Sequence, residues 1–357
     1  MNKALQEVMK ELSTCPCCSI GGDPPIYAEA KEFFGSDFPL YTGSRTRWRS
    51  KAKLAIREKN GKLVFGLFEP GTHNIVDCSK CSAHVQPIED ALTKLTLLQK
   101  LPAYKENGTG LLRYVQLHAN DKVELTIVAT KKDETLLKIL EALAKDPLFQ
   151  SIWLNINPRI TNTIFGDEWI KIAGEEFLFQ NILGKSFAFH PASFSQVNLP
   201  LFEKMLLSIR DYLPENTNLL ELYSGNGVIS LSLLDKCKQA YLVEKNPYSF
   251  ISFQETMKKF STKEQEKVLF YSSSLEELAE LPDVDTLLVD PPRKGLQGKL
   301  PDIPSLQRII YISCHFPSFK MDAEKLEHVG YSLVKAESYL FFPGSNHIEI
   351  LGIFEKG

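Results

Sequence analysis

The sequence lacks a long hydrophobic run. None of its 357 residues belongs to an apolar stretch of about 18 residues, the length that crosses a bilayer. The first residues, Met1 to Glu7, also lack the apolar centre of a signal peptide. We therefore expect a cytoplasmic chain that has no membrane partner.

The sequence also lacks an excess of basic residues. Lys and Arg number 41 against 44 Asp and Glu, which gives a net charge of -3. No global positive field attracts nucleic acid, so any RNA contact depends on local patches. No internal repeat or low-complexity tract is present. The length is sufficient for two domains, and nothing suggests more than a monomer.

Seven cysteines are few, and in a reducing compartment they are not expected to form disulfides. Four of them form two Cys-x-x-Cys pairs, Cys15 with Cys18 and Cys78 with Cys81. This spacing lets two thiolates of one turn reach the same metal, so we predict a metal site with these four ligands. Sulfur ligands suit zinc or an iron-sulfur cluster, and the spacing does not choose between them. The alternative is thiols on loops without a metal.

A basic stretch lies between the two cysteine pairs. Arg47, Arg49, Lys51 and Lys53 alternate with other residues, so on a strand they share one face, opposite Trp48. Such a face can neutralise RNA phosphates. A solvated edge strand would show the same pattern.

The first half of the chain has an α+β pattern. Its expected elements are an amphipathic helix over 87–100, strands over 108–117 and 123–130, a helix over 134–144 and a strand over 151–156. We expect one domain over residues 1–185 and a second over 186–357, where strands and helices begin to alternate.

The second half has the pattern of an α/β domain. A helix is expected over 199–212, and the expected strands cover 218–222, 241–244, 267–271, 286–289, 309–312, 331–339 and 347–354. The last two strands form a hairpin, so we predict a mostly parallel sheet with an antiparallel edge at the end of the chain.

A glycine turn follows the first strand of this domain. Gly225 and Gly227 let the backbone approach a ligand, and Glu244, which ends the next strand, can accept both ribose hydroxyls. The third glycine of the dinucleotide fingerprint is missing, because Ser230 occupies its position. A ligand without a pyrophosphate, such as S-adenosylmethionine, therefore fits better than NAD. The alternative is a tight turn without a ligand.

Three reactive side chains follow or begin later strands. Asp290 and Cys314 each come directly after an apolar strand, and Glu349 lies at the start of the last strand. The carboxyl ends of parallel strands are where ligands bind in open α/β sheets, so we expect these groups to meet at one rim. A core cysteine beside an ordinary strand-end carboxylate is the alternative.

These motifs together resemble the RNA 5-methyluridine methyltransferases. The resemblance is carried by Phe194-x-Gln196-x-Asn198, Tyr223-Ser-Gly-Asn-Gly227, Asp290-Pro-Pro-Arg-Lys-Gly295, Ser313-Cys314 and Phe342-Pro-Gly-Ser-Asn-His-Ile-Glu349. The N-terminal half is similar to the branch that lacks a leading β-barrel RNA-binding module. The fold implied is that of class I S-adenosylmethionine-dependent methyltransferases, preceded by an α+β RNA-recognition domain.

The resemblance implies an enzyme that methylates C5 of a uridine in rRNA or tRNA. Cys314 would add to C6, Glu349 would remove the C5 proton, and Asp290 would orient the base. Gln196, Tyr223, Gly225, Gly227, Glu244 and Asp290 would surround S-adenosylmethionine. The target uridine would be unpaired or flipped out of its stack.

The sequence departs from the family pattern at three positions. His315 replaces the usual Asn after the nucleophile, and Val228 follows the glycine turn in place of Asn or Thr. The iron-sulfur relatives carry a cysteine at the position of Met9, so Cys17 or Cys78 would supply the fourth ligand of a 4Fe-4S cluster. The alternative function is a non-catalytic RNA-binding protein that retains the fold, with His315 and Val228 as signs of decay.

Overall fold

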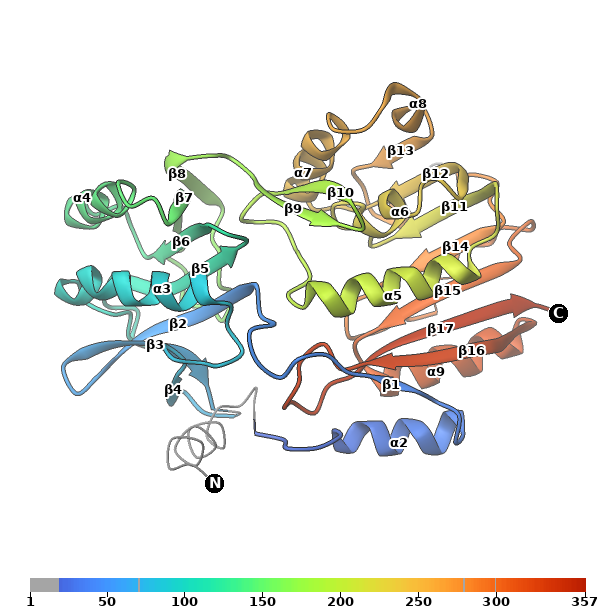
Figure 1. Ribbon diagram of the computed structural model, residues 1–357, viewed down its shortest axis with the longest axis horizontal. Helices are drawn as coiled ribbons and strands as arrows, with labels where there is room; N and C mark the ends of the chain where they lie inside the picture. The colour runs from blue at the N-terminus through green and yellow to red at the C-terminus, as the bar shows by residue number, and fades with distance from the viewer. Residues whose placement is uncertain (1–18, 70, 279, 299) are drawn as a thin grey trace. The chain divides into compact units, whose positions relative to one another are not determined.

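The computed structural model describes residues 19–357 except residues 70, 279 and 299 (Figure 1). The chain divides into two compact units. Residues 44–179 and 195–197 belong to the first unit, and residues 22–43, 180–194 and 198–357 to the second. This division differs from the single boundary expected between 185 and 186, because the early segment 22–43 packs with the second unit.

A seven-stranded sheet forms the centre of the first unit. Its strand order is β4-β3-β2-β5-β6-β7-β8. The strands are β2 (Lys51–Lys59), β3 (Lys62–Phe68), β4 (Ile75–Asp77), β5 (Leu112–Ala119), β6 (Val123–Ala129), β7 (Phe149–Ile156) and β8 (Glu168–Gly174). All neighbours are antiparallel except β6 and β7, which are parallel and are connected through a helix.

Helices α3 (Gln86–Lys94) and α4 (Glu134–Leu143) pack against this sheet, and a 3-10 helix, η1 (Leu95–Lys100), extends α3. The apolar side chains of α4 at Leu136, Leu140 and Leu143 are buried, as their helical spacing requires. Asp133 is the N-cap of α4, and its carboxylate accepts a hydrogen bond from the Leu136 nitrogen at 3.0 Å.

An eight-stranded sheet forms the centre of the second unit. Its order is β1-β16-β17-β15-β14-β11-β12-β13. The strands are β1 (Leu40–Tyr41), β11 (Thr217–Leu222), β12 (Cys237–Val243), β13 (Val268–Tyr271), β14 (Thr286–Val289), β15 (Arg308–Ser313), β16 (Tyr331–Tyr339) and β17 (Glu349–Lys356). A separate hairpin of β9 (Leu178–Ile182) and β10 (Lys185–Phe189) precedes it.

The strands from β11 to β15 are parallel, and β17 is antiparallel to both its neighbours. The predicted mostly parallel sheet with an antiparallel last strand is therefore confirmed. The prediction that the final hairpin forms the sheet edge is wrong, because β1 pairs with β16 outside it.

Helices cover both faces of this sheet (Figure 1). One core cluster joins one face of the sheet to α5 (Leu199–Tyr212), α6 (Val228–Ser232) and α7 (Pro247–Met257), and another joins the opposite face to α2 (Pro25–Phe34) and α9 (Phe316–His328). The short elements α8 (Thr262–Gln265) and η2 (Leu275–Glu277) lie in connections. In the described part of the chain, no helix has the length and apolar character needed to cross a membrane.

Candidate active site

Three strand ends bring the predicted catalytic residues to one rim of the second unit. Asp290 directly follows β14, and Cys314 directly follows the neighbouring strand β15. On the other side of β15, β17 runs antiparallel with Ser313 opposite Ile350. One step further along this register places Glu349 opposite Cys314.

Burial and charge perturb all three groups. Burial raises the pKa of Asp290 above its usual range. Burial also raises the pKa of Glu349, and the neighbouring charge of Asp290 adds to the increase. The pKa of Cys314 is raised to about 11 by burial and by the charges of Glu349 and Asp290. The three groups therefore interact electrostatically, as a shared site requires.

Arg293 adds a positive charge to this rim. Its charge opposes the increase in the pKa of Cys314 and of Glu349. His347 lies in the same field: burial, Arg293 and His315 all lower its pKa. Arg293 thus favours both the thiolate and the carboxylate that the expected chemistry needs.

His315, which follows the predicted nucleophile Cys314, caps a helix. It is the N-cap of α9, where its Nδ1 accepts a hydrogen bond from the Ser318 nitrogen at 3.4 Å and lies 2.8 Å from the Ser318 hydroxyl. The Ser318 hydroxyl donates to the carbonyl oxygen of Arg293 at 2.8 Å. His315 therefore helps to connect the Cys314 loop with the Asp-Pro-Pro-Arg loop.

The glycine turn between β11 and α6 has the backbone that the sequence predicts. Tyr223, Gly225 and Gly227 have positive φ angles of 60°, 54° and 76°. A Cβ atom on Gly227 would lie 2.4 Å from the Leu242 Cδ2, whereas one on Gly225 would meet nothing within 4 Å. Gly227 is needed for packing, and Gly225 leaves space that a ligand can use.

Glu244 is held beside this turn. Its two oxygens accept hydrogen bonds from the backbone nitrogens of Gly225, at 3.2 Å, and Asn246, at 2.7 Å. Each carboxylate oxygen has a further lone pair, so these contacts fix the orientation of the acid and leave it able to accept from a ribose.

The sequence reading missed Glu221, which lies in β11 and is 1% exposed. Burial raises its pKa to about 8, and the charges of Asp290 and Glu244 contribute to the increase. Its acidic side chain in an apolar strand was the available signal. A positively charged ligand bound near these carboxyl groups, such as a sulfonium compound, would favour their ionised forms.

Two buried polar atoms of the turn also suit a ligand. Within the described residues, the Ser224 hydroxyl and the Asn226 side-chain oxygen have no hydrogen-bond partner. Such atoms are costly unless another group satisfies them. The residues around Gly225 therefore fit S-adenosylmethionine.

Gln196 lies in the segment 195–197, which packs with the first unit. The neighbouring Val197 carbonyl accepts from the Ser50 nitrogen at 3.0 Å, and the Ser195 hydroxyl lies 3.4 Å from His118 Nε2. The role of Gln196 at the methyl donor stays a prediction.

The expected basic strand face is only partly correct. β2 begins at Lys51, whereas Arg47 has a φ of 57° and forms an ion pair with Glu89 at 3.0 Å. Lys51 is only 5% exposed, and burial lowers its pKa. Lys53 alone of the four lies exposed on β2, so the prediction that all four could meet phosphates is wrong.

The predicted metal ligands are only partly within the described structure. Cys78 and Cys81 are buried, at 2% and 9% exposure, and the Cys81 nitrogen donates to the Cys78 carbonyl at 3.2 Å. Cys15, Cys17 and Cys18 lie outside the described residues. Among the residues that are described, no group of three or more His, Cys, Asp or Glu side chains could hold a metal.

Comparison with known families decides the class of the protein. The model of the tRNA (uracil-5-)-methyltransferase family matches residues 25–356. The chain belongs to this family. The resemblance deduced from its motifs is confirmed, and with it the expectation of an RNA (uracil-5-)-methyltransferase at the level of the family.

Curated relatives of this family member are named as RNA methyltransferases. An uncharacterized RNA methyltransferase of Protochlamydia amoebophila is 36% identical over 367 residues, which cover 96% of each chain. Another, of Streptococcus mutans, is 30% identical and covers 92% of this chain and 75% of the relative.

A solved structure supports the fold. The tRNA (uracil-54, C5)-methyltransferase of Pyrococcus abyssi, in complex with S-adenosyl-L-homocysteine, matches with a TM-score of 0.74 at 20% identity. The match covers 92% of this chain and 81% of that one. The predicted class I methyltransferase fold is thus confirmed.

Proposed function

We propose that this protein transfers a methyl group from S-adenosylmethionine to C5 of a uridine in rRNA or tRNA, through a covalent adduct between Cys314 and C6. The observation that carries the proposal is the register of β15 and β17, in which Ser313 lies opposite Ile350, so that its continuation brings Glu349 opposite Cys314; Asp290 directly follows the neighbouring strand β14. The family of the chain and the RNA methyltransferase names of its relatives support the same reaction.

The reaction begins at Cys314. Its thiolate adds to C6 of the uracil ring, and the electron pair of the C5–C6 double bond moves toward O4, which makes C5 nucleophilic. Arg293 favours the thiolate against the opposing charges of Glu349 and Asp290. The ring must leave its stack to reach this thiol, so the target uridine is unpaired or flipped.

S-adenosylmethionine supplies the electrophilic methyl group that C5 takes up. Tyr223, Gly225, Gly227 and Glu244 would line the place proposed for it, where Glu244 accepts from the Gly225 nitrogen at 3.2 Å. Asp290 would orient the uracil ring.

Glu349 completes the reaction. As a carboxylate it removes the proton from C5, the double bond forms again, and the thiolate of Cys314 leaves from C6. A general base works best when its pKa lies near the working pH. Burial moves the pKa of Glu349 upward from the range of exposed carboxylates.

The test uses RNA carrying 5-tritiated uridine, transcribed as tRNA and as rRNA segments. The full chain with S-adenosylmethionine should release tritium, and Cys314→Ala should abolish the release. Cys237→Ala, which changes a buried cysteine outside the site, serves as the control and should retain activity. Release that persists in Cys314→Ala would refute the covalent route.

A second assay separates the roles of the two residues. Glu349→Gln should still form the adduct and accept the methyl group, but it should stall there as a denaturant-resistant protein–RNA complex. If no variant releases tritium or forms an adduct, and calorimetry detects no binding of S-adenosylmethionine, the non-catalytic alternative replaces this proposal.

A further inference from the structure

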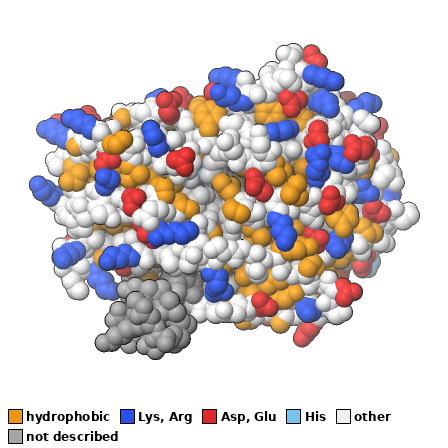
Figure 2. All heavy atoms as spheres, viewed as in Figure 1, with side chains coloured by type: hydrophobic (Ala, Val, Ile, Leu, Met, Phe, Trp, Pro, Cys, Tyr) orange, Lys and Arg blue, Asp and Glu red, His pale blue; other side chains and the backbone are white. Residues whose placement is uncertain are grey.

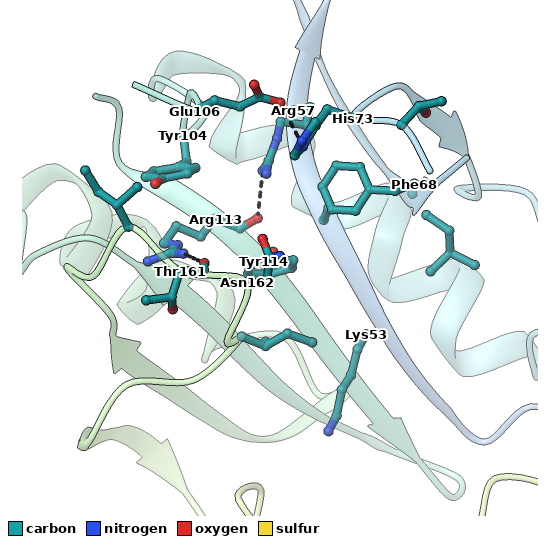
Figure 3. A pocket seen from close by; sticks show the side chains of 16 residues that line it. Lys53, Arg57, Phe68, His73, Tyr104, Glu106, Arg113, Tyr114, Thr161 and Asn162 are labelled. Atoms are coloured by element: carbon teal, nitrogen blue, oxygen red, sulfur yellow. Dashed lines mark hydrogen bonds and ion pairs between the residues drawn. The ribbon is translucent and has the colours of Figure 1, made fainter. Parts of the chain in front are cut away.

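The first unit contains a pocket that combines cations and aromatic rings. It has a volume of 470 Å³, within the roughly 300–1,000 Å³ of small-ligand sites. Lys53 and Arg57 reach it from β2, Phe68 from β3, and Tyr114 from β5, while Tyr104 lies in the preceding loop (Figure 3). The pocket is built entirely from residues of the first unit.

Arg57 lies at the centre of these rings. Its guanidinium carbon is 5.1 Å from the ring centroid of Phe68, 5.5 Å from that of Tyr104 and 5.9 Å from that of Tyr114. Figure 3 shows Phe68 and Tyr104 on either side of it. Its Nη1 donates to the Ile56 carbonyl at 2.8 Å and the Arg113 carbonyl at 3.4 Å, which fixes the planar group in place.

Arg113 anchors the loop after β7, which forms one side of the pocket. The side chain is 1% exposed and donates to the carbonyl oxygens of Asn157, Arg159 and Thr161 at 2.7, 2.5 and 2.9 Å. Its guanidinium also lies 4.5 Å from the Tyr104 ring centroid. The loop that follows β7 is therefore anchored, and the shape of the pocket is set before any ligand arrives.

The charge of the pocket favours an anionic ligand. Lys53, Arg57 and Arg113 contribute three positive charges. Among the described residues that line this pocket, Glu106 is the only acid, and its Oε1 lies 2.8 Å from His73 Nδ1. On the face drawn in Figure 2, by contrast, Lys and Arg side chains are interspersed with Asp and Glu.

A second hollow continues from this pocket. It has a volume of 640 Å³ and shares Arg57, His73, Tyr104 and Glu106 with the first. Lys59 and Lys105 line it as well, together with the acids Glu58 and Glu69, so this hollow has no excess of positive charge. The two hollows together offer space for more than one unit of a chain.

We propose that this pocket binds a nucleotide of single-stranded RNA at a distance in the sequence from the target uridine, with the base on Phe68 and Arg57 and a phosphate on Lys53. Rings beside cations are the general means of binding single-stranded nucleic acid without reading its sequence. The inference rests on the RNA substrate of the proposed function and adds a second contact to it.

The test measures binding of fluorescein-labelled, single-stranded dodecauridylate to the full chain by anisotropy at several salt concentrations. Phe68→Leu keeps an apolar side chain but removes the ring, and Arg57→Lys keeps the charge but removes the planar group. Each should weaken binding about 10-fold while the salt dependence stays unchanged. Lys53→Ala should reduce the slope of log K against log salt by about 1.

Lys132→Ala is the matched control for Lys53→Ala, because Lys132 is exposed, pairs with Glu168 and does not line the pocket. It should retain both the affinity and the slope of the wild type. Thermal unfolding of each variant shows whether the unit stays folded.

Equal affinity of folded Phe68→Leu, Arg57→Lys and wild type overturns the proposal, and leaves a protein segment as the better occupant. The outcome is separable from that of the proposed function. Tritium release with unchanged KM in the pocket variants would refute the pocket alone. A ring-dependent affinity without tritium release would refute the methyl transfer alone.

Discussion

Ser230 donates two hydrogen bonds to the same carboxylate oxygen of Glu221, one from its backbone nitrogen at 3.1 Å and one from its hydroxyl. Ser230 occupies the position of the third glycine in dinucleotide-binding turns. Both hydrogen bonds lower the pKa of Glu221, yet burial dominates and raises it to about 8. The acid is therefore protonated in the folded protein over a range where the unfolded chain has lost its proton.

This difference predicts a pH dependence of stability. A raised pKa in the folded state contributes stability that is complete below the unfolded pKa of 4.5 and is lost as the pH rises to about 8. Across this window the free energy of unfolding of the wild type should fall by about 1.4 kcal/mol per pH unit because of Glu221. The Glu221→Gln variant should lack this fall. Urea denaturation of both proteins from pH 5 to pH 8 measures it. If the free energies of unfolding of the two proteins change with pH in parallel, Glu221 does not titrate between pH 5 and pH 8.

The reactivity of Cys314 provides a second prediction. Since its pKa is raised to about 11, alkylation by iodoacetamide should still increase from pH 8 to pH 10. Glu349→Gln removes a charge that opposes the thiolate, so it should accelerate labelling at pH 8.5 by about 3- to 10-fold, or half to one pKa unit. Arg293→Gln should slow it.

Mass spectrometry of the labelled peptide distinguishes Cys314 from Cys237, whose pKa burial raises to about 12 and which serves as the slow internal reference. Wild-type labelling that is already maximal at pH 7 would contradict the raised pKa of Cys314.

The helix cap at His315 predicts the effect of the family's usual residue. His315→Ala removes the cap of α9 and should lower the free energy of unfolding by about 1 kcal/mol. His315→Asn restores a good cap and should stay within a few tenths of the wild type. Tritium release by the same two variants tests whether the cap positions the loop that carries Cys314. The kcat should fall in the Ala variant and recover in the Asn variant. An Ala variant as stable as the wild type would show that the His315 side chain does not stabilise α9.

The two turn glycines should fail differently when replaced by Ala. Gly225→Ala places its methyl group in open space, so the protein should fold, with a cost of about 1 kcal/mol for the positive φ, and should bind S-adenosylhomocysteine more weakly. Gly227→Ala meets the buried Leu242 and should mainly lower the melting temperature. Calorimetry and thermal unfolding of both variants separate the two effects. If Gly225→Ala binds S-adenosylhomocysteine as tightly as the wild type, the methyl donor does not bind at this turn.

Strong local patterns predicted much of the fold. The helix expected over 199–212 is α5 with the same bounds, and the strands before Asp290 and Cys314 are β14 and β15. These segments carry continuous apolar runs or clear helical periodicity. The two-residue strand β1 was missed, because it exists only through its pairing with β16 from the far end of the chain.

The candidate sites, like the fold, could be predicted only where they depend on residues close together in the sequence. Motif spacing predicted the turn of Gly225 and the rim of Cys314, since each depends on residues close in sequence to a strand end. The period-two pattern placed Lys51 and Lys53 on one face, but it could not show which of them is buried. Arg57 went unnoticed, because its rings come from β3, β5 and the loop of Tyr104.

The predicted metal site combines Cys78 and Cys81 with residues outside the described structure, and it stays a prediction. Both are held in one tight turn, with sulfur ligands that suit an iron-sulfur cluster or zinc. We expect anaerobically purified protein to be brown and to contain iron, and Cys78→Ser and Cys81→Ser to lose both the colour and the iron. Cys237→Ser, which changes a buried cysteine of the second unit, should keep them.

Metal analysis and absorption spectra measure this directly and do not depend on activity. Colourless protein with stoichiometric zinc would exclude the cluster but retain the site. Protein with neither metal would refute the site, and the burial of Cys78 and Cys81 would then reflect packing alone. Cys17→Ser addresses the remaining choice of ligand: if it keeps the metal while Cys78→Ser loses it, Cys78 is the fourth ligand, because a thiolate that holds the metal cannot be replaced without loss of affinity.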